Sequence, residues 1–210
     1  SKNMTTLGTA LEFLASHAFT RSDMIAALGG GVVGDLSGLC AAMFLRGIRY
    51  VQIPTTLLAC VDSSVGGKCA VDLAAGKNLA GAFWQPSLVI CDPSLLSTLP
   101  DAEFANGMAE VIKYGAGFDR KLFDMTLGNV RENPDPIIAR CIKIKRDTIE
   151  SDEFDRGERK KLNLGHTIGH AVEKCSGFSI PHGSAVSMGL YAIYKAYAAE
   201  EASVIKKALE

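Results

Sequence analysis

Three consecutive glycines open the segment GGGVVGD, from Gly29 to Asp35, and they constrain the fold of this chain most strongly. They follow a short apolar run, 24–28, which has the length of a strand. They precede the apolar segment 33–44, which we interpret as a buried helix. Glycine turns arise for steric reasons, but glycine also lets a backbone approach a phosphate closely at a helix N-terminus. The turn therefore predicts a strand–helix unit, with nucleotide binding as a hypothesis.

Two further runs of strand length, 49–54 and 87–91, follow the glycine turn, and an amphipathic segment, 6–17, precedes it. A strand, a glycine turn, a helix and another strand predict a parallel α/β unit. After Asp92-Pro93 the segments with a helical pattern are 100–114, 134–151, 165–174 and 183–206. We therefore predict an α/β domain at residues 1–93 and an all-helical domain at residues 94–210.

The charge and the cysteines exclude several classes of protein. The chain of 210 residues has 22 Lys and Arg against 23 Asp and Glu, which argues against binding nucleic acid or membranes through bulk charge. No apolar run approaches the length of about eighteen residues that a membrane span needs. The six cysteines are scattered without a C-x-x-C pair, which is typical of reduced thiols. We expect a cytoplasmic protein that binds anions through local clusters of Lys and Arg.

A glycine-rich stretch carries two lysines in similar settings. Lys68 follows a Gly-Gly pair in VDSSVGGKCAVD, and Lys77 follows a glycine in GKNLAGAFWQP, with Asn78 beside it. Ammonium groups on loops, next to bare backbone, suit phosphate or carboxylate groups. A single loop lysine is usually only solvated. Two of them so close together, in an otherwise apolar stretch, favour an anionic ligand.

Three of the four histidines and one carboxylate form a pattern typical of a metal site. His166 and His170 are four residues apart in NLGHTIGH, so a helix places both on one face. His182 follows in PHG, and Glu110 lies in the otherwise apolar segment GMAEVIK. A lone histidine is more often a packed core residue, as we interpret His17. His and Glu are nevertheless good zinc ligands, and three protein ligands leave one position for a substrate. The spacing alone favours His166 and His170 as the ligand pair.

The chain resembles the 3-dehydroquinate synthase family of sugar phosphate cyclases at five long motifs: GGGVVGD, RGIRYVQIPTTLLACVDSSVGGKCAVD, GKNLAGAFWQP, NGMAEVIK and LNLGHTIGHAVE. The resemblance runs from about Lys2 to Tyr194, in the order of the family. It implies a Rossmann-like, NAD-binding α/β domain and an all-α, metal-binding domain, with the active site in a cleft between them. The family pattern has strands before Lys2 and helices beyond the last residue, so we expect both domains to be incomplete at their outer ends.

The resemblance also implies roles for individual residues. The expected NAD-binding residues are Lys2, Gly30, Gly31, Val32, Asp35, Thr55, Thr56, Lys77 and Thr98. The expected ligands of zinc, or alternatively of cobalt, are Glu110, His166 and His182. The expected substrate-binding residues are Arg46, Asp62, Lys68, Asn78, Lys113, Lys145, Arg159, Asn163 and His170. The expected catalytic residues are His170, Lys113, Asp62 and Asp155, the last at a position where relatives usually have Glu.

One of these implied roles differs from what the sequence pattern alone indicates, and another involves a second subunit. His170 is expected to transfer protons near the substrate and not to bind the metal, contrary to the interpretation from its spacing. Arg46 is expected to reach the phosphate of the substrate bound to a neighbouring subunit, which predicts a homodimer.

The implied activity is that of a carbon–oxygen lyase of the shikimate pathway, in aromatic amino acid biosynthesis. It converts the sugar acid 3-deoxy-arabino-heptulosonate 7-phosphate to 3-dehydroquinate and phosphate. The implied steps are transient oxidation by NAD, β-elimination, reduction and intramolecular aldol closure, with zinc lowering the pKa of a substrate hydroxyl. Because each hydride is returned, NAD is expected to be used catalytically.

Three other interpretations remain open at this point. Another sugar phosphate cyclase, such as a deoxy-inosose or valiolone synthase, would share the fold, the metal and NAD but would accept a substrate without a carboxylate. A metal-dependent polyol dehydrogenase would produce NADH. A non-catalytic copy with a binding role would fit a truncated chain. The presence of Arg159, Asn163 and His170 favours a sugar acid.

Overall fold

The structure is a computed structural model, and it describes residues 1–209. Contacts within the chain divide it into two compact units, Ser1–Thr98 and Leu99–Glu210, and each is described by itself. The sequence places the boundary at residue 93, close to the end of the first unit.

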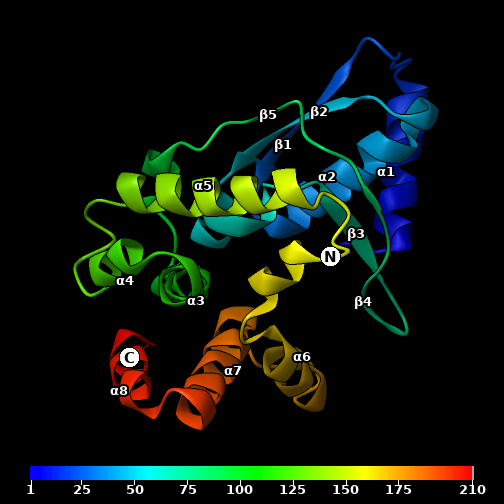
Figure 1. Cartoon of the computed structure of the whole chain (residues 1–210). Helices are drawn as coiled ribbons and strands as arrows, with labels where there is room; N and C mark the ends of the chain where they lie inside the picture. The colour runs from blue at the N-terminus through cyan, green and yellow to red at the C-terminus, as the bar shows by residue number, and fades with distance from the viewer. Residues whose placement is uncertain (210) are drawn as a thin grey trace. The chain divides into compact units, whose positions relative to one another are not determined.

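The first unit is built on a parallel sheet of three strands (Figure 1). Its strands are β1 (Met24–Gly29), β2 (Arg49–Pro54) and β5 (Leu88–Val89), and β2 lies between the other two. Helix α2 (Gly31–Met43) connects β1 to β2 and packs on both strands. This is the strand–turn–helix–strand unit that the glycine turn predicts, and it makes the unit Rossmann-like.

One hydrophobic core holds the first unit together. Helix α1 (Met4–Ser16) contributes Leu7 and Leu14, which pack with Leu39 of α2 and Tyr50 of β2. Burial of such side chains stabilises a fold by about 1.5–3 kcal/mol each. The N-terminus of α1 is fixed by Asn3, whose side chain accepts a hydrogen bond of 2.9 Å from the backbone N–H of Thr6. The early amphipathic segment is therefore a helix, as predicted.

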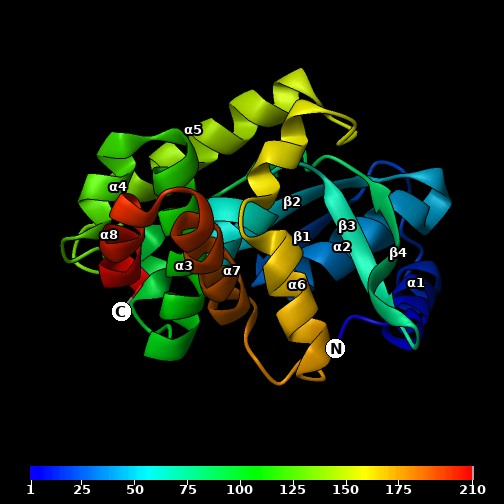
Figure 2. The same ribbon diagram turned by 60° about the horizontal axis from the view of Figure 1, so that its bottom comes forward.

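An antiparallel hairpin completes the first unit. Strands β3 (Lys68–Leu73) and β4 (Gly76–Phe83) pair with each other and lie against α2 (Figure 2). Lys68 and Lys77 are predicted from the sequence to lie on loops, and that prediction is wrong, since they lie in β3 and β4. The buried residues Cys69 and Val71 alternate along β3 in the manner of a half-buried strand. The glycines obscure this pattern, although Gly81 serves the pairing: a Cβ there would lie 2.3 Å from the carbonyl oxygen of Cys69.

The second unit is largely helical. Its helices are α3 (Asp101–Phe118), α4 (Arg120–Thr126), α5 (Asp135–Ser151), α6 (His166–Cys175), α7 (His182–Tyr197) and α8 (Ala199–Leu209). Helix α3 is central, since it contacts α4, α5, α7 and α8. Its Ile112 packs in a core with Phe123, Leu190 and Ile205. The predicted all-α character of this half is confirmed.

Two details of the second unit differ from the sequence prediction. The predicted helix 183–206 is two helices, because Ala198 leaves the helical conformation with φ −149° and ψ 65°. Helix α4 is not predicted, since its seven residues are too few for a helical period to be recognised. Asp119 caps its N-terminus, since the side chain of Asp119 accepts a hydrogen bond of 3.1 Å from Leu122 N.

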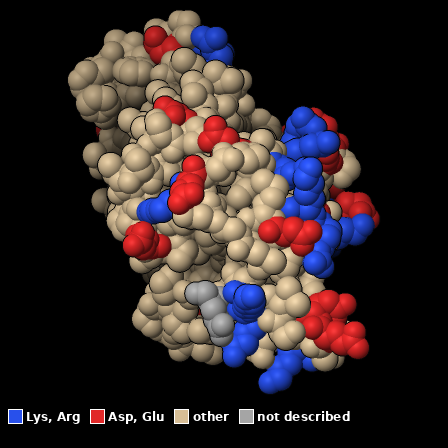
Figure 3. Space-filling model, turned by 90° about the vertical axis from the view of Figure 1, so that its left-hand side faces the viewer, with Lys and Arg blue, Asp and Glu red and all other residues tan. Residues whose placement is uncertain are grey.

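Shorter turns connect these elements: η1 (Phe44–Arg46), η2 (Ala59–Ser63), η3 (Pro93–Leu96) and η4 (Glu158–Asn163). None of the helices within residues 1–209 is long and apolar enough to cross a membrane. The face drawn in Figure 3 carries acidic and basic side chains interspersed on a largely uncharged surface. Cys40, Cys60, Cys69 and Cys141 are buried as free thiols.

Candidate functional site

Helix α3 carries a charged pair at the centre of the helical unit. The side chains of Glu110 and Lys113 are 0% and 2% exposed, and Lys113 Nζ forms an ion pair with Glu110 Oε2. Removing a carboxylate from water is costly unless opposite charge or hydrogen-bond donors compensate it. Within residues 1–209 the carboxylate oxygens of Glu110 have no polar partner besides this ion pair and the rings of two histidines. Glu110 is therefore suited to bind a cation in addition to Lys113.

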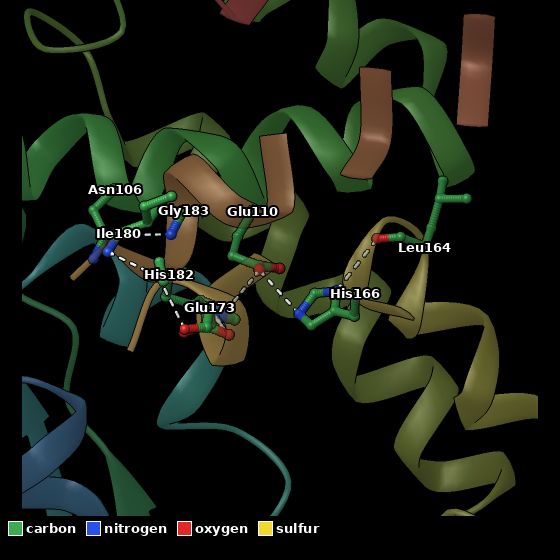
Figure 4. Close-up of polar contacts among 9 residues, drawn as sticks. Asn106, Glu110, Leu164, His166, Glu173, Ile180, His182 and Gly183 are labelled. Atoms are coloured by element: carbon green, nitrogen blue, oxygen red, sulfur yellow. Dashed lines mark hydrogen bonds and ion pairs between the residues drawn. The ribbon is translucent and has the colours of Figure 1, made fainter. Parts of the chain in front are cut away.

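Two histidines from other helices point at the same carboxylate (Figure 4). His166 begins α6 and His182 begins α7. Their Nε2 atoms lie 3.3 Å and 3.4 Å from Glu110 Oε1. The side chain of His166 is 12% exposed and that of His182 is 30% exposed. The structure thus brings together the three residues that the family resemblance implies as metal ligands.

Close helix packing places the two histidines side by side. A Cβ at Gly189 of α7 would lie 2.0 Å from the carbonyl oxygen of Gly165, directly before α6. A Cβ at Gly169 would lie 3.0 Å from the carbonyl oxygen of Ala185. These glycines therefore let α6 and α7 approach more closely than larger residues would. The start of α7 is tied to α3 by a hydrogen bond of 2.5 Å from Gly183 N to Asn106 Oδ1.

The geometry of Glu110, His166 and His182 fits a divalent metal ion. Ligand atoms at about 2.0–2.1 Å from a tetrahedral zinc ion are separated from one another by about 3.3–3.4 Å. The distances from Glu110 Oε1 to the two Nε2 atoms are 3.3 Å and 3.4 Å. One ligand atom from each residue lies within 4.8 Å of the others. Two imidazole nitrogens and a carboxylate oxygen are a known donor set of catalytic zinc.

The charged side chains of this group stabilise one another's ionised forms. Burial alone would raise the pKa of Glu110, but Lys113 and the two histidine rings outweigh it and hold that pKa well below its usual range. Burial would likewise lower the pKa of His182, but the carboxylates of Glu110 and Glu173 outweigh it and raise that pKa. The site therefore holds an ionised carboxylate that favours positive charge beside it.

His170 lies near this group but is placed differently. Its ring centroid is 5.3 Å from that of His166 and 6.1 Å from that of His182. It is exposed, and it is absent from the set formed by Glu110 with the other two histidines. It belongs instead to a second set of potential ligands, with Glu173 and His182. Partial desolvation of its ring lowers the pKa of His170, and His166 lowers it further, so the neutral imidazole is favoured.

The other predicted residues of the helical unit include two buried cations. Lys145, on α5, is 7% exposed, and Arg159, in η4, is 3% exposed. Arg159 Nη1 donates a hydrogen bond of 2.6 Å to the carbonyl oxygen of Glu153. Asn163 ends η4 and is exposed, while Asp155 has a φ of 58° in the preceding loop.

The glycine turn of the first unit is a tight turn that leaves little room for side chains at its glycines. Gly29 has a φ of 155°, and a Cβ there would lie 2.6 Å from Val33 Cγ2. Gly30 precedes α2, and a Cβ on it would lie 3.0 Å from Thr56 Cγ2. The backbone N–H of Thr55 donates a hydrogen bond of 3.0 Å to the carbonyl oxygen of Gly29. The structure thus brings the glycine turn and both predicted threonines together at the N-terminus of α2.

A second group of predicted residues in this unit surrounds Lys2. Its Nζ lies 2.5 Å from Asp35 Oδ2 on α2, and it also donates a hydrogen bond to Asn78 Oδ1. The backbone of Lys2 is held by β3, because the N–H of Asp72 donates a hydrogen bond of 2.9 Å to its carbonyl oxygen. Asn78 adopts a left-handed φ of 57° in β4. Two residues expected at the cofactor and one expected at the substrate therefore form one polar group.

The remaining predicted residues of the first unit are spread over several elements. Gly31 and Val32 begin α2, Asp62 lies in η2, and Lys68 and Lys77 lie in the hairpin strands. Arg46 is exposed at the end of η1 with a φ of 66°. Thr98 is the last residue of this unit. The expected NAD-binding residues all belong to this unit, the expected metal ligands belong to the helical one, and the substrate-binding residues come from both.

Two residues that support the group of Glu110, His166 and His182 are not identified from the sequence. Glu173 is 5% exposed and approaches His182, and Asn106 holds the start of α7. Glu173 follows His170 by three residues and His166 by seven, so a helical periodicity search would place it on their face. His17, by contrast, stacks on Phe13 at the end of α1, with ring centroids 4.1 Å apart, as a structural residue would.

The chain is similar to curated proteins over nearly its whole length. The curated 3-dehydroquinate synthase of Clostridium perfringens (strain 13 / Type A) is 51% identical over 213 residues, which cover 99% of this chain and 60% of that protein. That of Clostridium acetobutylicum is 50% identical and covers 93% of this chain and 56% of the relative. The chain thus spans about 60% of the length of these curated relatives.

Solved structures of sugar phosphate cyclases share the fold. A 2-deoxy-scyllo-inosose synthase complexed with carbaglucose-6-phosphate, NAD⁺ and Co²⁺ is 29% identical with a TM-score of 0.90, covering 99% of this chain and 61% of that one. ValA, a 2-epi-5-epi-valiolone synthase from Streptomyces hygroscopicus with NAD⁺ and Zn²⁺ bound, is 27% identical with a TM-score of 0.90, covering 100% of this chain and 63% of that one.

Family models cover nearly the whole chain. The model of the 3-dehydroquinate synthase N-terminal domain matches residues 1–106, and that of the C-terminal domain matches residues 107–209. These matches, together with curated relatives at about half identity, include every motif described above. The chain belongs to the 3-dehydroquinate synthase family.

Proposed function

We propose that the full-length protein is a 3-dehydroquinate synthase, which converts 3-deoxy-arabino-heptulosonate 7-phosphate to 3-dehydroquinate and phosphate with NAD and a divalent metal ion. The observation that carries the proposal is the geometry of Glu110, His166 and His182, which fits a catalytic zinc ion. Curated relatives of that name at about half identity support the choice of reaction.

Glu110, His166 and His182 would hold the metal ion, which we propose to be zinc, with cobalt as an alternative. When bound, such an ion supplies a Lewis acid that lowers the pKa of a substrate hydroxyl. Three protein ligands leave a coordination position for that hydroxyl. The negative charge of Glu110 and the buried setting of the group favour a divalent cation over water alone.

The glycine turn of the first unit would bind NAD, which supplies a hydride acceptor when bound. At the N-terminus of α2 the first backbone N–H groups have no partner within the helix, and the helix dipole is positive there. Both features favour the binding of a pyrophosphate. Gly30 leaves the backbone bare beside Thr56. We expect Lys2 and Asp35, which pair with each other, to contact the cofactor as well.

Three buried cations in the helical unit would bind the anionic substrate. Lys113, Lys145 and Arg159 are 1%, 7% and 3% exposed. Lys and Arg are rarely buried to this extent without an opposite charge or a ligand nearby. A planar guanidinium such as that of Arg159 binds a carboxylate through two parallel hydrogen bonds, so we assign it to the carboxylate of the sugar acid.

We further propose that His170 moves protons to and from the substrate, since its lowered pKa favours the neutral base form. The exposed Arg46 would reach the phosphate bound by a second copy of the chain, so the active protein would be a homodimer in the cytoplasm.

The direct test is product formation by the full-length protein loaded with zinc and NAD. We expect release of phosphate and formation of 3-dehydroquinate from the heptulosonate phosphate. A hexose phosphate without a carboxylate should be turned over at least about a hundredfold less efficiently, because a site built for a charged group discriminates strongly against its absence. Equal or preferred turnover of the hexose phosphate would instead identify a different sugar phosphate cyclase.

A further inference from the structure

Glu173 approaches the face of His182 that is turned away from Glu110. Its Oε2 lies 3.4 Å from His182 Nδ1, slightly longer than a usual N–H···O hydrogen bond, while His182 Nε2 lies 3.4 Å from Glu110 Oε1 (Figure 4). The side chain of Glu173 is 7% exposed. One imidazole ring therefore bridges two buried carboxylates, each of which faces a different nitrogen.

We propose that Glu173 is a positioning residue for the metal site: its carboxylate accepts a hydrogen bond from His182 Nδ1 and holds Nε2 toward Glu110 and the metal ion. The inference rests on the proposed metal site and adds a residue to which the predicted ligand set gives no role.

The tautomer of His182 explains why a carboxylate is needed at that place. A neutral imidazole that binds a metal through Nε2 carries its proton on Nδ1, and that N–H needs an acceptor. A carboxylate acceptor fixes the rotation of the ring and makes Nε2 a stronger donor to the metal. Glu173 offers such an acceptor, whereas an apolar residue would leave the N–H of Nδ1 without one.

His166 has a corresponding partner of a weaker kind. Its Nδ1 lies 3.3 Å from the carbonyl oxygen of Leu164, and its Nε2 points at Glu110. Both histidine ligands thus have an oxygen acceptor at Nδ1 and direct Nε2 at the same carboxylate. The acceptor of His182 is charged, and the side chain of His182 is the more exposed of the two, at 30% against 12%. The ring with less packing around it therefore has the stronger acceptor.

The helix packing keeps Glu173 in place. Glu173 lies in the last turns of α6, and His182 begins α7. The carbonyl oxygen of Glu173 accepts a backbone hydrogen bond of 2.8 Å from Phe178 N, which fixes the turn between the two helices. The side chain of Glu173 is thus held against the start of α7 by a short connection.

If Glu173 were itself a metal ligand, the expected number of bound zinc ions would differ. His170, Glu173 and His182 also lie close enough to bind a cation together. In that arrangement Glu173 would itself be a ligand of a second ion, and the protein would bind two equivalents of zinc. The exposure of His170 and the buried setting of Glu110 favour a single ion at Glu110.

The test compares Glu173→Gln with Glu103→Gln in the full-length protein. Glu103 is an exposed carboxylate on α3, the helix that carries Glu110, so it controls for the loss of one negative charge. Zinc affinity is measured by competition with a chromophoric chelator, zinc stoichiometry by elemental analysis, and thermal unfolding on the metal-free proteins. The absorption bands of the cobalt-substituted proteins report the geometry of the ligands.

We expect Glu173→Gln to bind one equivalent of zinc about 10–100-fold more weakly than the wild type, with shifted cobalt bands. Glu103→Gln should match the wild type in both, and metal-free Glu173→Gln should unfold within a few degrees of it. Affinity and cobalt bands equal to those of the wild type would overturn the inference. So would two equivalents in the wild type and one in Glu173→Gln. If the wild type itself binds no metal, the proposed function fails as well.

Discussion

Lys113 and Glu110 form an ion pair one helical turn apart on α3, and their side chains are 2% and 0% exposed. The same carboxylate faces the Nε2 atoms of His166 and His182. Lys113 and a divalent ion would therefore neutralise one and the same buried charge. This relationship leads to a prediction about stability that does not depend on turnover.

Lys113→Met should destabilise the metal-free protein more than the zinc-loaded protein. Breaking a buried ion pair by removing one partner costs about 3–5 kcal/mol, because the other charge stays buried without compensation. Bound zinc would compensate that charge, so the loss should be smaller in its presence. Urea unfolding of both forms measures the difference, with Lys121→Met, at an exposed lysine of α4, as the control. Equal losses in the two forms would show that zinc does not bind at Glu110.

The second prediction separates His170 from the two other histidines. His166→Ala and His182→Ala should lose bound zinc and activity together, because each supplies an Nε2 atom to the group at Glu110. His170→Ala should keep nearly one equivalent of zinc and lose roughly 10²–10⁴-fold in kcat, the usual effect of a missing acid–base group. Metal analysis of the purified variants, together with kcat, distinguishes the roles. Loss of zinc in His170→Ala would make His170 a ligand.

The third prediction concerns the carboxylate of the substrate. Arg159→Ala should reduce kcat/KM by an amount equivalent to about 2–4 kcal/mol, since a charge-assisted contact is lost. Arg159 also donates a hydrogen bond to the carbonyl oxygen of Glu153, so part of any effect is structural. Arg159→Lys retains the charge and should recover part of the loss, which a purely structural role would not require. An unchanged kcat/KM in Arg159→Ala would place the carboxylate elsewhere.

The fourth prediction concerns Asp119, which caps α4 and pairs with Arg140 at 2.6 Å. Asp119→Ala should lower the free energy of unfolding by about 1 kcal/mol, and Asp119→Asn should lose less, because Asn also caps helices well. Burial alone would raise the pKa of Asp119, but the N–H of Leu122 and the charge of Arg140 outweigh it and lower that pKa. The contribution is therefore present above the pKa of the unfolded state and disappears as the pH falls through the folded pKa. Urea unfolding at pH 7 and at pH 3 tests this; an unchanged difference at pH 3 would contradict it.

Much of the fold follows from patterns within short segments. Strand β2 has the predicted bounds of 49–54, and β1, α1, α2 and α5 lie within about two residues of prediction, because each has a clear apolar period or a glycine at its end. The hairpin of β3 and β4 is obscured by glycines and lysines whose places are set by pairing across the sheet and not by their own propensity. The break at Ala198 is not predicted because no glycine or proline lies next to it in the sequence.

The candidate metal ligands are likewise only partly predictable from local patterns in the sequence. The spacing of His166 and His170 indicates a helical pair, but the ligand atoms that meet at Glu110 belong to His166 and His182. That meeting depends on how α6 and α7 pack at Gly165 and Gly189, a contact between segments that no local pattern encodes. For the same reason Glu173 is not apparent from the sequence, although its spacing from His170 is helical.

The most direct test of the proposed reaction is the ratio of NADH formed to phosphate released. The full-length, zinc-loaded protein is supplied with the heptulosonate phosphate and with NAD in slight excess over enzyme, and both products are followed in time. Because each hydride is returned to the substrate, we predict many equivalents of phosphate per enzyme while NADH stays below one equivalent. Net accumulation of NADH up to the NAD supplied, without phosphate release, would contradict the proposal and identify a polyol dehydrogenase.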